Sequence, residues 1–178
     1  MHSNSDEQLA IRMQRDDLVA SAEFYSRHKG DVFQFCVRLL HNTQDAEDAL
    51  QSAFLKFLHS VHSLRSPSTV KAWLYAIVRN EVYSSLRKRR SNGSLDEVEV
   101  PGAETPHETF VRSEDIEVVQ RLMQELKPEY YEVLFLLEYE SMSYAEISEA
   151  IGVSVAAVEA RIFRARKELS QKLLDYTH

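Results

Sequence analysis

Apolar side chains recur every three to four residues along most of the chain, which is the spacing of an amphipathic α-helix. Residues 45–59 are a clear case, because Ala46, Ala49, Ala53 and Phe57 fall on one face. On this basis helices are predicted over residues 8–29 (one or two helices), 31–41, 45–59, 69–90, 113–126, 128–140, 142–152 and 154–174. With only 4 Gly and 4 Pro in 178 residues, the composition also favours an all-α protein.

Two segments lack this periodicity. Residues 62–70 are predicted to form a loop around Pro67, and residues 91–112 carry Asn-Gly, Pro-Gly and Thr-Pro steps among polar and acidic side chains. The longer segment is typical of a flexible, acidic linker. It divides the chain into two small helical domains, 1–90 and 113–178, each long enough to bury a modest core.

The charge of the chain is unevenly distributed. Its net charge of −7 is unfavourable for a protein that binds DNA unaided, because affinity for DNA depends on neutralising phosphates. Residues 1–90, however, carry 13 Lys and Arg against 10 Asp and Glu, whereas residues 91–112 and 113–178 are acidic. This pattern favours a protein that contacts DNA through small basic patches while a larger partner supplies most of the affinity.

The sequence disfavours several classes of protein. No apolar run reaches the length of a membrane span, and the polar N-terminus lacks a signal-peptide core, so a soluble cytoplasmic protein is expected. The single cysteine, Cys36, lies in an apolar run and is interpreted as a small core residue. His59 and His62 lack further ligands nearby, and no Gly-rich phosphate loop or catalytic triad is apparent. We therefore expect no enzymatic activity, cofactor, metal or small-molecule substrate.

The most informative motif lies near the C-terminus. Ser143 and Glu146 have the spacing of a capping box, and Gly152 suits the left-handed residue that commonly ends a helix. Ser154 follows and can cap the next helix. Two capped helices joined by a glycine turn form a helix-turn-helix.

The second helix of this motif has two different faces. Four apolar residues at spacings of four and three are predicted to pack inward: Val158, Ile162, Ala165 and Leu169. The opposite face carries small residues, then an aromatic and cations: Ala156, Ala160, Phe163, Arg164 and Lys167. This second face suits insertion into a DNA major groove. On geometry alone, an ordinary solvated amphipathic helix accounts for the pattern equally well.

Three segments together resemble one known family. Residues 143–167, beginning Ser-Tyr-Ala-Glu-Ile, are similar to the promoter-recognising module of the extracytoplasmic-function (ECF) sigma factors. Residues 45–57, beginning Asp-Ala-Glu-Asp-Ala, resemble the polymerase-binding helix of that family. Residues 71–80, beginning Lys-Ala-Trp-Leu-Tyr, together with the basic run 87–90 resemble its next helix. The motifs occur in the family's order and spacing, and the resemblance covers nearly all the chain except the linker.

The resemblance implies a transcription initiation factor built from two helical domains. Residues 1–90 would form sigma region 2, which binds the clamp coiled coil of core RNA polymerase and recognises and melts the −10 promoter element. Residues 113–178 would form sigma region 4, which contacts the polymerase flap and recognises the −35 element as duplex DNA. Core RNA polymerase and promoter DNA are the partners expected from this resemblance.

Four polar residues of the 45–59 helix are the polymerase-binding candidates by position in the family: Asp45, Glu47, Asp48 and Gln51. Carboxylates on one exposed edge can pair with arginines of a partner. From the residues alone, plain surface charge is the alternative. Ser52 stands where relatives usually carry another acid, a departure that would weaken or tune docking.

The family's −10 region corresponds to residues 62–70 and the helix that follows. Capture of an unpaired base requires hydrogen bonds to its edge and an apolar or aromatic wall. The candidates near the base are Lys71, Trp73, Tyr75, Arg79 and Asn80, and those for backbone phosphates are Arg87, Lys88, Arg89 and Arg90. Trp73 lies on an apolar stripe, so a core position is its alternative. Cations at 87–90 also suit the C-terminal end of a helix dipole.

The −35 candidates all lie on the second helix of the helix-turn-helix or at its start. They are Ser154, Ala156, Ala157, Glu159, Ala160, Arg161, Phe163, Arg164, Arg166 and Lys167. Arg164 is the first choice for a bidentate contact to guanine, while Arg166 and Lys167 are candidates for the DNA backbone. Glu159 departs from the basic residue of many relatives, and it either accepts from a cytosine amine or repels phosphate.

Two other functions remain open from the sequence. One is a helix-turn-helix regulator with a helical sensing or dimerisation domain, which would bind its operator without polymerase. The other is a helical adaptor that makes no DNA contact. The resemblance further implies control by an anti-sigma factor, which can retain such a factor at the membrane although the chain itself is not expected to insert.

Overall fold

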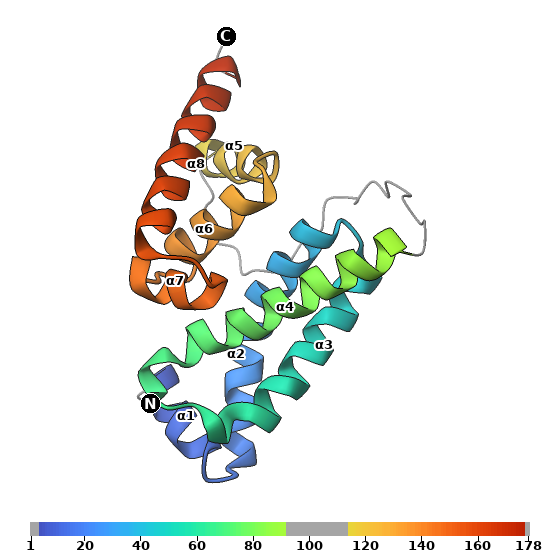
Figure 1. Ribbon diagram of the computed structural model, residues 1–178, viewed down its shortest axis with the longest axis vertical. Coiled ribbons are helices and arrows are strands. Elements are labelled where there is room, and N and C mark those ends of the chain that lie inside the picture. The colour runs from blue at the N-terminus through green and yellow to red at the C-terminus, as the bar shows by residue number, and fades with distance from the viewer. Residues whose placement is uncertain (1–3, 92–113, 177–178) are drawn as a thin grey trace. The chain divides into compact units, whose positions relative to one another are not determined.

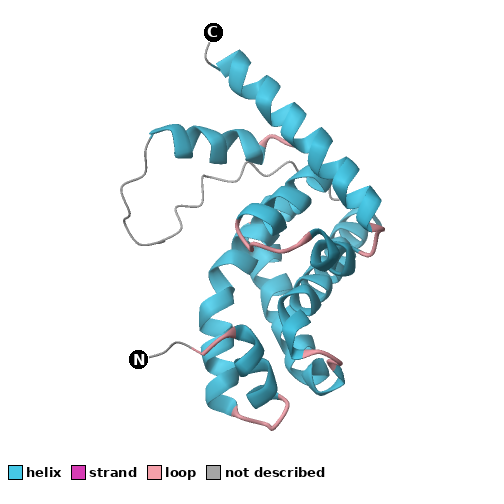
Figure 2. Ribbon diagram, turned by 90° about the vertical axis from the view of Figure 1, so that its left-hand side faces the viewer, coloured by secondary structure: helices cyan, strands magenta, loops and turns pink. Residues whose placement is uncertain are grey.

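The computed structural model describes residues 4–91 and 114–176, which form an N-terminal and a C-terminal helical body (Figure 1). Figure 2 shows only helices and loops in this part of the chain, as the sequence predicts. None of the helices among these residues is long and apolar enough to cross a membrane. The predicted linker, 91–112, lies outside the described residues except for Ser91, which ends a helix.

The N-terminal body is built around three helices that pack against one another. Its elements are α1 (Asp6–Met13), α2 (Leu18–Leu40), α3 (Thr43–Ser60), the 3₁₀ turns Val61–Ser63 and Pro67–Thr69, and α4 (Val70–Ser91). Helices α2, α3 and α4 contact each other in every pairing, and α1 packs on α2 (Figure 1). The α3 and α4 boundaries lie within two residues of those predicted.

Polar side chains fix where α2 and α3 begin. The Asp17 carboxylate accepts hydrogen bonds from the amides of Val19 and Ala20, and the Asn42 side chain accepts one of 2.9 Å from the amide of Asp45. Amides in the first turn of a helix have no partner within the helix, so these caps stabilise the starts. His41 ends α2 in the left-handed conformation, with φ of 50°.

The prediction of separate helices over 8–29 and 31–41 was wrong, because α2 runs without a break through Gly30. Glycine costs about 1 kcal/mol relative to alanine inside a helix. That cost is outweighed by burial on both sides of it, since Phe24, His28, Val32 and Phe35 line one buried face across the glycine. The break that does occur comes earlier, at residues 14–17 between α1 and α2.

Aromatic side chains from all three long helices meet in the core of the N-terminal body. Phe24 of α2 stacks on Phe57 of α3 at a centroid distance of 5.0 Å, and Phe35 of α2 meets Tyr75 of α4 edge-on at 5.4 Å. These geometries are favourable beyond simple area burial. Cys36 is fully buried nearby in α2, as predicted, and burial raises the pKa of its thiol to about 12.

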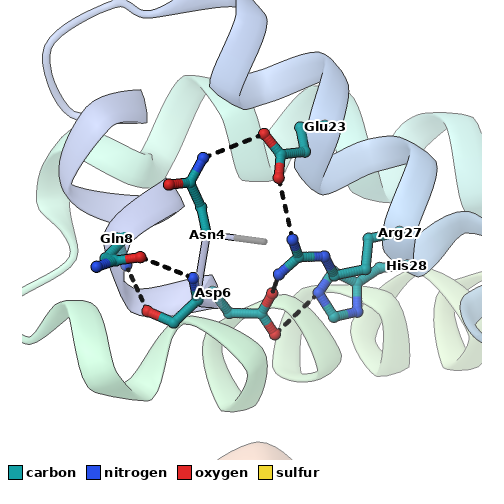
Figure 3. Close-up of polar contacts among 7 residues, drawn as sticks. Asn4, Asp6, Gln8, Glu23, Arg27 and His28 are labelled. Atoms are coloured by element: carbon teal, nitrogen blue, oxygen red, sulfur yellow. Dashed lines mark hydrogen bonds and ion pairs between the residues drawn. The ribbon is translucent and has the colours of Figure 1, made fainter. Parts of the chain in front are cut away.

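Helix α1 is attached to α2 by charged side chains (Figure 3). Arg27 donates a hydrogen bond of 2.7 Å to Asp6, and His28 Nε2 lies 3.1 Å from the other Asp6 oxygen. Asn4 donates to Glu23, which also pairs with Arg27. Burial raises the pKa of Asp6, but the hydrogen bonds and charges of His28 and Arg27 outweigh it and set the pKa below its ordinary value of 3.8.

The C-terminal body consists of four helices, with α8 as its central element. They are α5 (Glu114–Gln124), α6 (Pro128–Glu138), α7 (Tyr144–Ile151) and α8 (Val155–Tyr176), and both α5 and α6 pack against α8. Pro128 occupies the first turn of α6, where its missing N–H removes no helical hydrogen bond. Val133 and Leu136 of α6 and Ile162 of α8 are buried.

Candidate nucleic-acid and polymerase interfaces

The turn between α7 and α8 is fixed by local hydrogen bonds. The amide of Ser143 donates to the Glu146 carboxylate at 2.7 Å, and the amide of Glu146 donates to Ser143 Oγ at 3.3 Å, which confirms the predicted capping box. Gly152 adopts a φ of +70°, and Ser154 Oγ accepts from the amide of Ala157. Ser148 adds a contact that was not predicted, because its hydroxyl donates to the Val153 carbonyl across the turn. The helix-turn-helix geometry therefore follows from residues 143–157.

Helix α8 has the two faces that the sequence predicts. Val158, Ile162 and Ala165 are buried, and Leu169 is partly buried. Phe163 is 71% exposed, a high value for a phenylalanine. The other −35 candidates that are exposed are Ser154, Ala156, Glu159, Arg164, Arg166 and Lys167, and those that are partly exposed are Ala157, Ala160 and Arg161. Arg166 also pairs with Glu138 of α6 at 2.9 Å, on a solvent-exposed part of the helix.

The polymerase-binding candidates form the outer edge of α3. Glu47, Asp48 and Gln51 are exposed, while Ala46, Ala49 and Ala53 of the same helix are buried. Asp45 differs from the other three because it is only partly exposed and its Oδ2 lies 3.5 Å from Arg89 Nη1. The helix thus presents an acidic and amide edge to solvent over about two turns.

The loop at 62–70 is attached to the turn between α1 and α2. The side-chain amide of Gln14 donates hydrogen bonds to the carbonyls of Val61 and Leu64, at 3.2 and 2.8 Å. His62 Nδ1 lies 3.1 Å from the Gln14 carbonyl, and its Nε2 lies 3.4 Å from Asp16. Gln14 could not be identified from the sequence, because its partners lie 47 and 50 residues away.

The candidates near an unpaired base do not all reach the surface. Asn80 is exposed, and Lys71, Trp73 and Arg79 are partly exposed. The Trp73 indole donates to Ser60 Oγ at 3.2 Å, and the Arg79 guanidinium lies 4.5 Å from the centre of the Tyr83 ring. Tyr75 is only 1% exposed and packs against Phe35, so its prediction as a base contact is corrected to a position in the aromatic core.

The basic residues at the end of α4 also divide into two kinds. Arg87, Lys88 and Arg90 are exposed, as phosphate contacts would be. Arg89 is partly buried and donates a hydrogen bond of 2.8 Å to the carbonyl of Leu40. Arg89 therefore differs from its three neighbours, because part of its guanidinium is engaged by the body of the protein, and its predicted phosphate contact stays a prediction.

Family models place the two bodies in one class of protein. The model of Sigma-70 region 2 matches residues 24–92, and the model of Sigma-70 region 4 matches residues 116–169. Together they cover more than half of the chain, and they define a sigma subunit of RNA polymerase, which binds the core enzyme and directs transcription initiation at promoters. Within this class, the chain belongs to the ECF sigma factors of the sigma-70 family.

Curated relatives match along almost their full length. The chain is 30% identical over 180 aligned residues to the RNA polymerase sigma-H factor of Pseudomonas aeruginosa, covering 94% of this chain and 93% of that protein. It is 28% identical to the ECF RNA polymerase sigma factor SigW of Bacillus subtilis, covering 92% and 94%. Among solved structures it is similar to the sigma factor RpoE of Bartonella quintana in complex with the anti-sigma factor NepR. That match has a TM-score of 0.68 and 27% identity, covering 86% of this chain and 96% of that one.

Proposed function

We propose that this sigma factor uses three separate surfaces to bind polymerase, the −10 element and the −35 element, and we assign residues to each. The outer edge of α3 binds the clamp coiled coil of core polymerase. Residues 62–70 and α4 capture and contact the opened −10 element. The exposed face of α8 recognises the −35 element as duplex, while its domain contacts the polymerase flap. The factor acts in the cytoplasm beside the polymerase and performs no catalysis itself.

The observation that carries this proposal is the exposed edge of α3. Glu47, Asp48 and Gln51 lie in solvent on a helix whose opposite face is buried, and the carboxylates of Glu47 and Asp48 make no hydrogen bond or ion pair within residues 4–91 and 114–176. Carboxylates that are not used in folding are available to arginines of a partner, where charge-assisted pairs are strong. A regulator that binds its operator without polymerase has no need of such a surface.

The face of α8 supports duplex recognition by its shape and chemistry. Ala156 and Ala160 keep the N-terminal half of the helix narrow, which allows close approach to a major groove. Phe163 offers an apolar contact of the kind that thymine methyl groups accept, and Arg164 offers a bidentate donor for guanine. Lys167 and Arg166 follow toward the far end, where the DNA backbone would lie.

The −10 surface combines partly exposed side chains with a short basic run. Lys71, Trp73, Arg79 and Asn80 supply polar and aromatic groups beside the loop, and Tyr75 supports them from the core. Arg87, Lys88 and Arg90 extend this surface with charges for backbone phosphates. The net positive charge of residues 1–90 is consistent with contact to single-stranded DNA.

Control by an anti-sigma factor is part of this proposal. The similar RpoE structure was solved in complex with an anti-sigma factor, and a second similar structure, of CnrH, holds the cytosolic domain of CnrY. That second match has a TM-score of 0.68 and 26% identity. A partner of this kind would occupy one or more of the three surfaces and would retain the factor until a signal arrives.

Charge reversal on α3 tests the proposal. Asp48→Lys should weaken binding to core polymerase at least tenfold while leaving thermal unfolding nearly unchanged, because Asp48 is exposed. Glu7 on α1 is also an exposed acid, so Glu7→Lys is the matched control and should bind core as the native chain does. If the Asp48 variant, alone and combined with Asp45→Lys, binds core at native strength, the polymerase-binding surface is assigned to the wrong helix.

A further inference from the structure

One guanidinium connects the ends of three helices. Arg89 lies in the last turn of α4 with 26% of its side chain exposed. Its Nη1 donates to the carbonyl of Leu40, the last residue of α2, at 2.8 Å. The same nitrogen lies 3.5 Å from Oδ2 of Asp45, in the first turn of α3. The neighbouring cations Arg87, Lys88 and Arg90 are all exposed and have no such position.

The electrostatics of these helix ends favour this arrangement. The last carbonyls of a helix have no partner within it, and the C-terminal end carries partial negative charge, so a cation beside Leu40 is stabilising. Asp45 lies in the first turn of α3, where a carboxylate is favoured by the N-terminal partial positive charge. Arg89 therefore lies between a helix end and a carboxylate that both attract it.

The short connection between α2 and α3 belongs to the same electrostatic region. His41 forms this connection in a left-handed conformation, and its Nε2 lies 3.1 Å from Arg38 Nη1. Burial lowers the pKa of His41, and the charges of Arg38 and Arg89 lower it further. Because the charge of Arg89 affects the pKa of the His41 imidazole, that pKa reports whether the guanidinium is in place.

We propose that Arg89 is a positioning residue for the polymerase-binding surface, setting the orientation of the Asp45 carboxylate and of the first turn of α3, and is not a phosphate contact like its neighbours. The inference rests on the proposed function of α3 as that surface. Through Arg89, the end of the helix proposed to contact −10 DNA is linked directly to the helix proposed to contact polymerase. Loss of Arg89 releases Asp45 and the connection at His41 together.

Matched variants separate a positioning role from a phosphate contact. Arg89→Gln should weaken binding of the full chain to core polymerase by about 3- to 10-fold, within the range of coupled neighbours. It should leave the salt dependence of promoter binding by the holoenzyme unchanged. Arg87→Gln should instead bind core with native affinity and lower the slope of promoter affinity against salt concentration by about one. Arg89→Lys, which keeps the charge and one donor, should recover part of the core affinity.

Two further measurements connect the effect to the observed contacts. NMR titration of His41 should give a higher pKa in Arg89→Gln than in the native chain, and an unchanged pKa in Arg87→Gln. In a double-mutant cycle for core binding, Arg89→Gln should cost less in the Asp45→Asn background than in the native one. Such non-additivity is expected only if Arg89 acts through Asp45.

The outcomes also separate this inference from the proposed function. If Arg89→Gln lowers the salt slope as Arg87→Gln does and binds core normally, Arg89 is a phosphate contact and the inference is wrong. Additive effects of the Arg89 and Asp45 changes would likewise overturn it. If Asp48→Lys and Asp45→Asn both bind core normally, α3 is not the polymerase-binding surface. The positioning role of Arg89 then fails as well, even if the pKa of His41 shows that Arg89 is in place. Should Arg89→Gln not fold, the cycle is run with Arg89→Lys.

Discussion

The side-chain amide of Gln14 donates a hydrogen bond of 2.8 Å to the carbonyl oxygen of Leu64, fifty residues further along the chain. With the second bond to Val61, this amide joins the turn after α1 to the loop that precedes α4. The loop is the one proposed to receive an unpaired base, and its backbone is positioned by a residue outside the proposed set of base contacts.

Replacing Gln14 by methionine, which has a similar shape but no donor, is therefore expected to loosen this loop. Each lost hydrogen bond costs about 0.5–1.5 kcal/mol, so the free energy of unfolding should fall by roughly 1–3 kcal/mol in urea titration. Formation of the open promoter complex, followed with a fluorescent base at −10, should also slow. Gln124→Met, an exposed change at the end of α5, is the control. If the Gln14 variant opens the promoter at the native rate, the position of this loop does not affect promoter opening.

Alanine at the two glycines that the structure describes should change the free energy of unfolding in opposite directions. Gly152 has a φ of +70°, a conformation in which alanine is strained, so Gly152→Ala should lower the free energy of unfolding by about 1–2 kcal/mol. Gly30 lies in α2 with no atom within 4 Å of an added Cβ, so Gly30→Ala should raise it by about 0.5–1 kcal/mol. Urea unfolding of both variants measures this. A stabilised Gly152→Ala would contradict the left-handed turn.

Acid should weaken the attachment of α1 to α2. The pKa of Asp6 is lower in the folded chain than its ordinary value of 3.8, so the unfolded chain takes up the proton first as the pH falls. The stabilising contribution of Asp6 is thus fully present above pH 3.8. It is lost as the pH falls further, through the lower pKa that Asp6 has in the folded chain. Asp6→Asn should remove this part of the pH dependence, whereas Glu7→Gln, at an exposed neighbouring acid, should retain it. Equal acid profiles for the native chain and Asp6→Asn would show that the contact contributes nothing.

Arg164 is expected to contribute specificity at the −35 element. Arg164→Ala should cost about 1–3 kcal/mol in promoter recognition by the holoenzyme and relax the preference at one base pair. Lys167→Ala, proposed to face the backbone, should instead weaken binding to all sequences about equally and lower the salt slope by about one. Transcription from a randomised −35 library, with Arg121→Ala of α5 as a control, measures both. An unchanged preference for Arg164→Ala would remove this residue from the base contacts.

Features that depend on near neighbours in the sequence could be predicted from it. The capping box of Ser143 and Glu146, the left-handed Gly152 and the buried face of α8 all arise from contacts or spacings within a few residues. Local sequence specifies such contacts because the helix itself brings positions three and four apart together. The same reasoning located the exposed edge of α3, since its buried and exposed residues alternate with the helical period.

Features that depend on distant residues could not be predicted. Spacing alone did not show that Tyr75 faces the aromatic core, because which side of α4 is buried is decided by packing of α2 and α3. Arg89 belongs to a run of four cations that look equivalent in sequence, and only the position of Leu40, 49 residues earlier, distinguishes it. Likewise α2 continues through Gly30 because tertiary burial outweighs the local preference of glycine.

The state of Cys36 has a practical consequence for following this protein on its polymerase. It is the one thiol in the chain, and with a pKa of about 12 almost none of it is in the reactive thiolate form at neutral pH. A cysteine introduced at an exposed position, such as Ser91 or Tyr176, would therefore take up a maleimide dye without prior removal of the native one. A fluorescent dye can then be attached to either body through one introduced cysteine, with no other substitution in the chain.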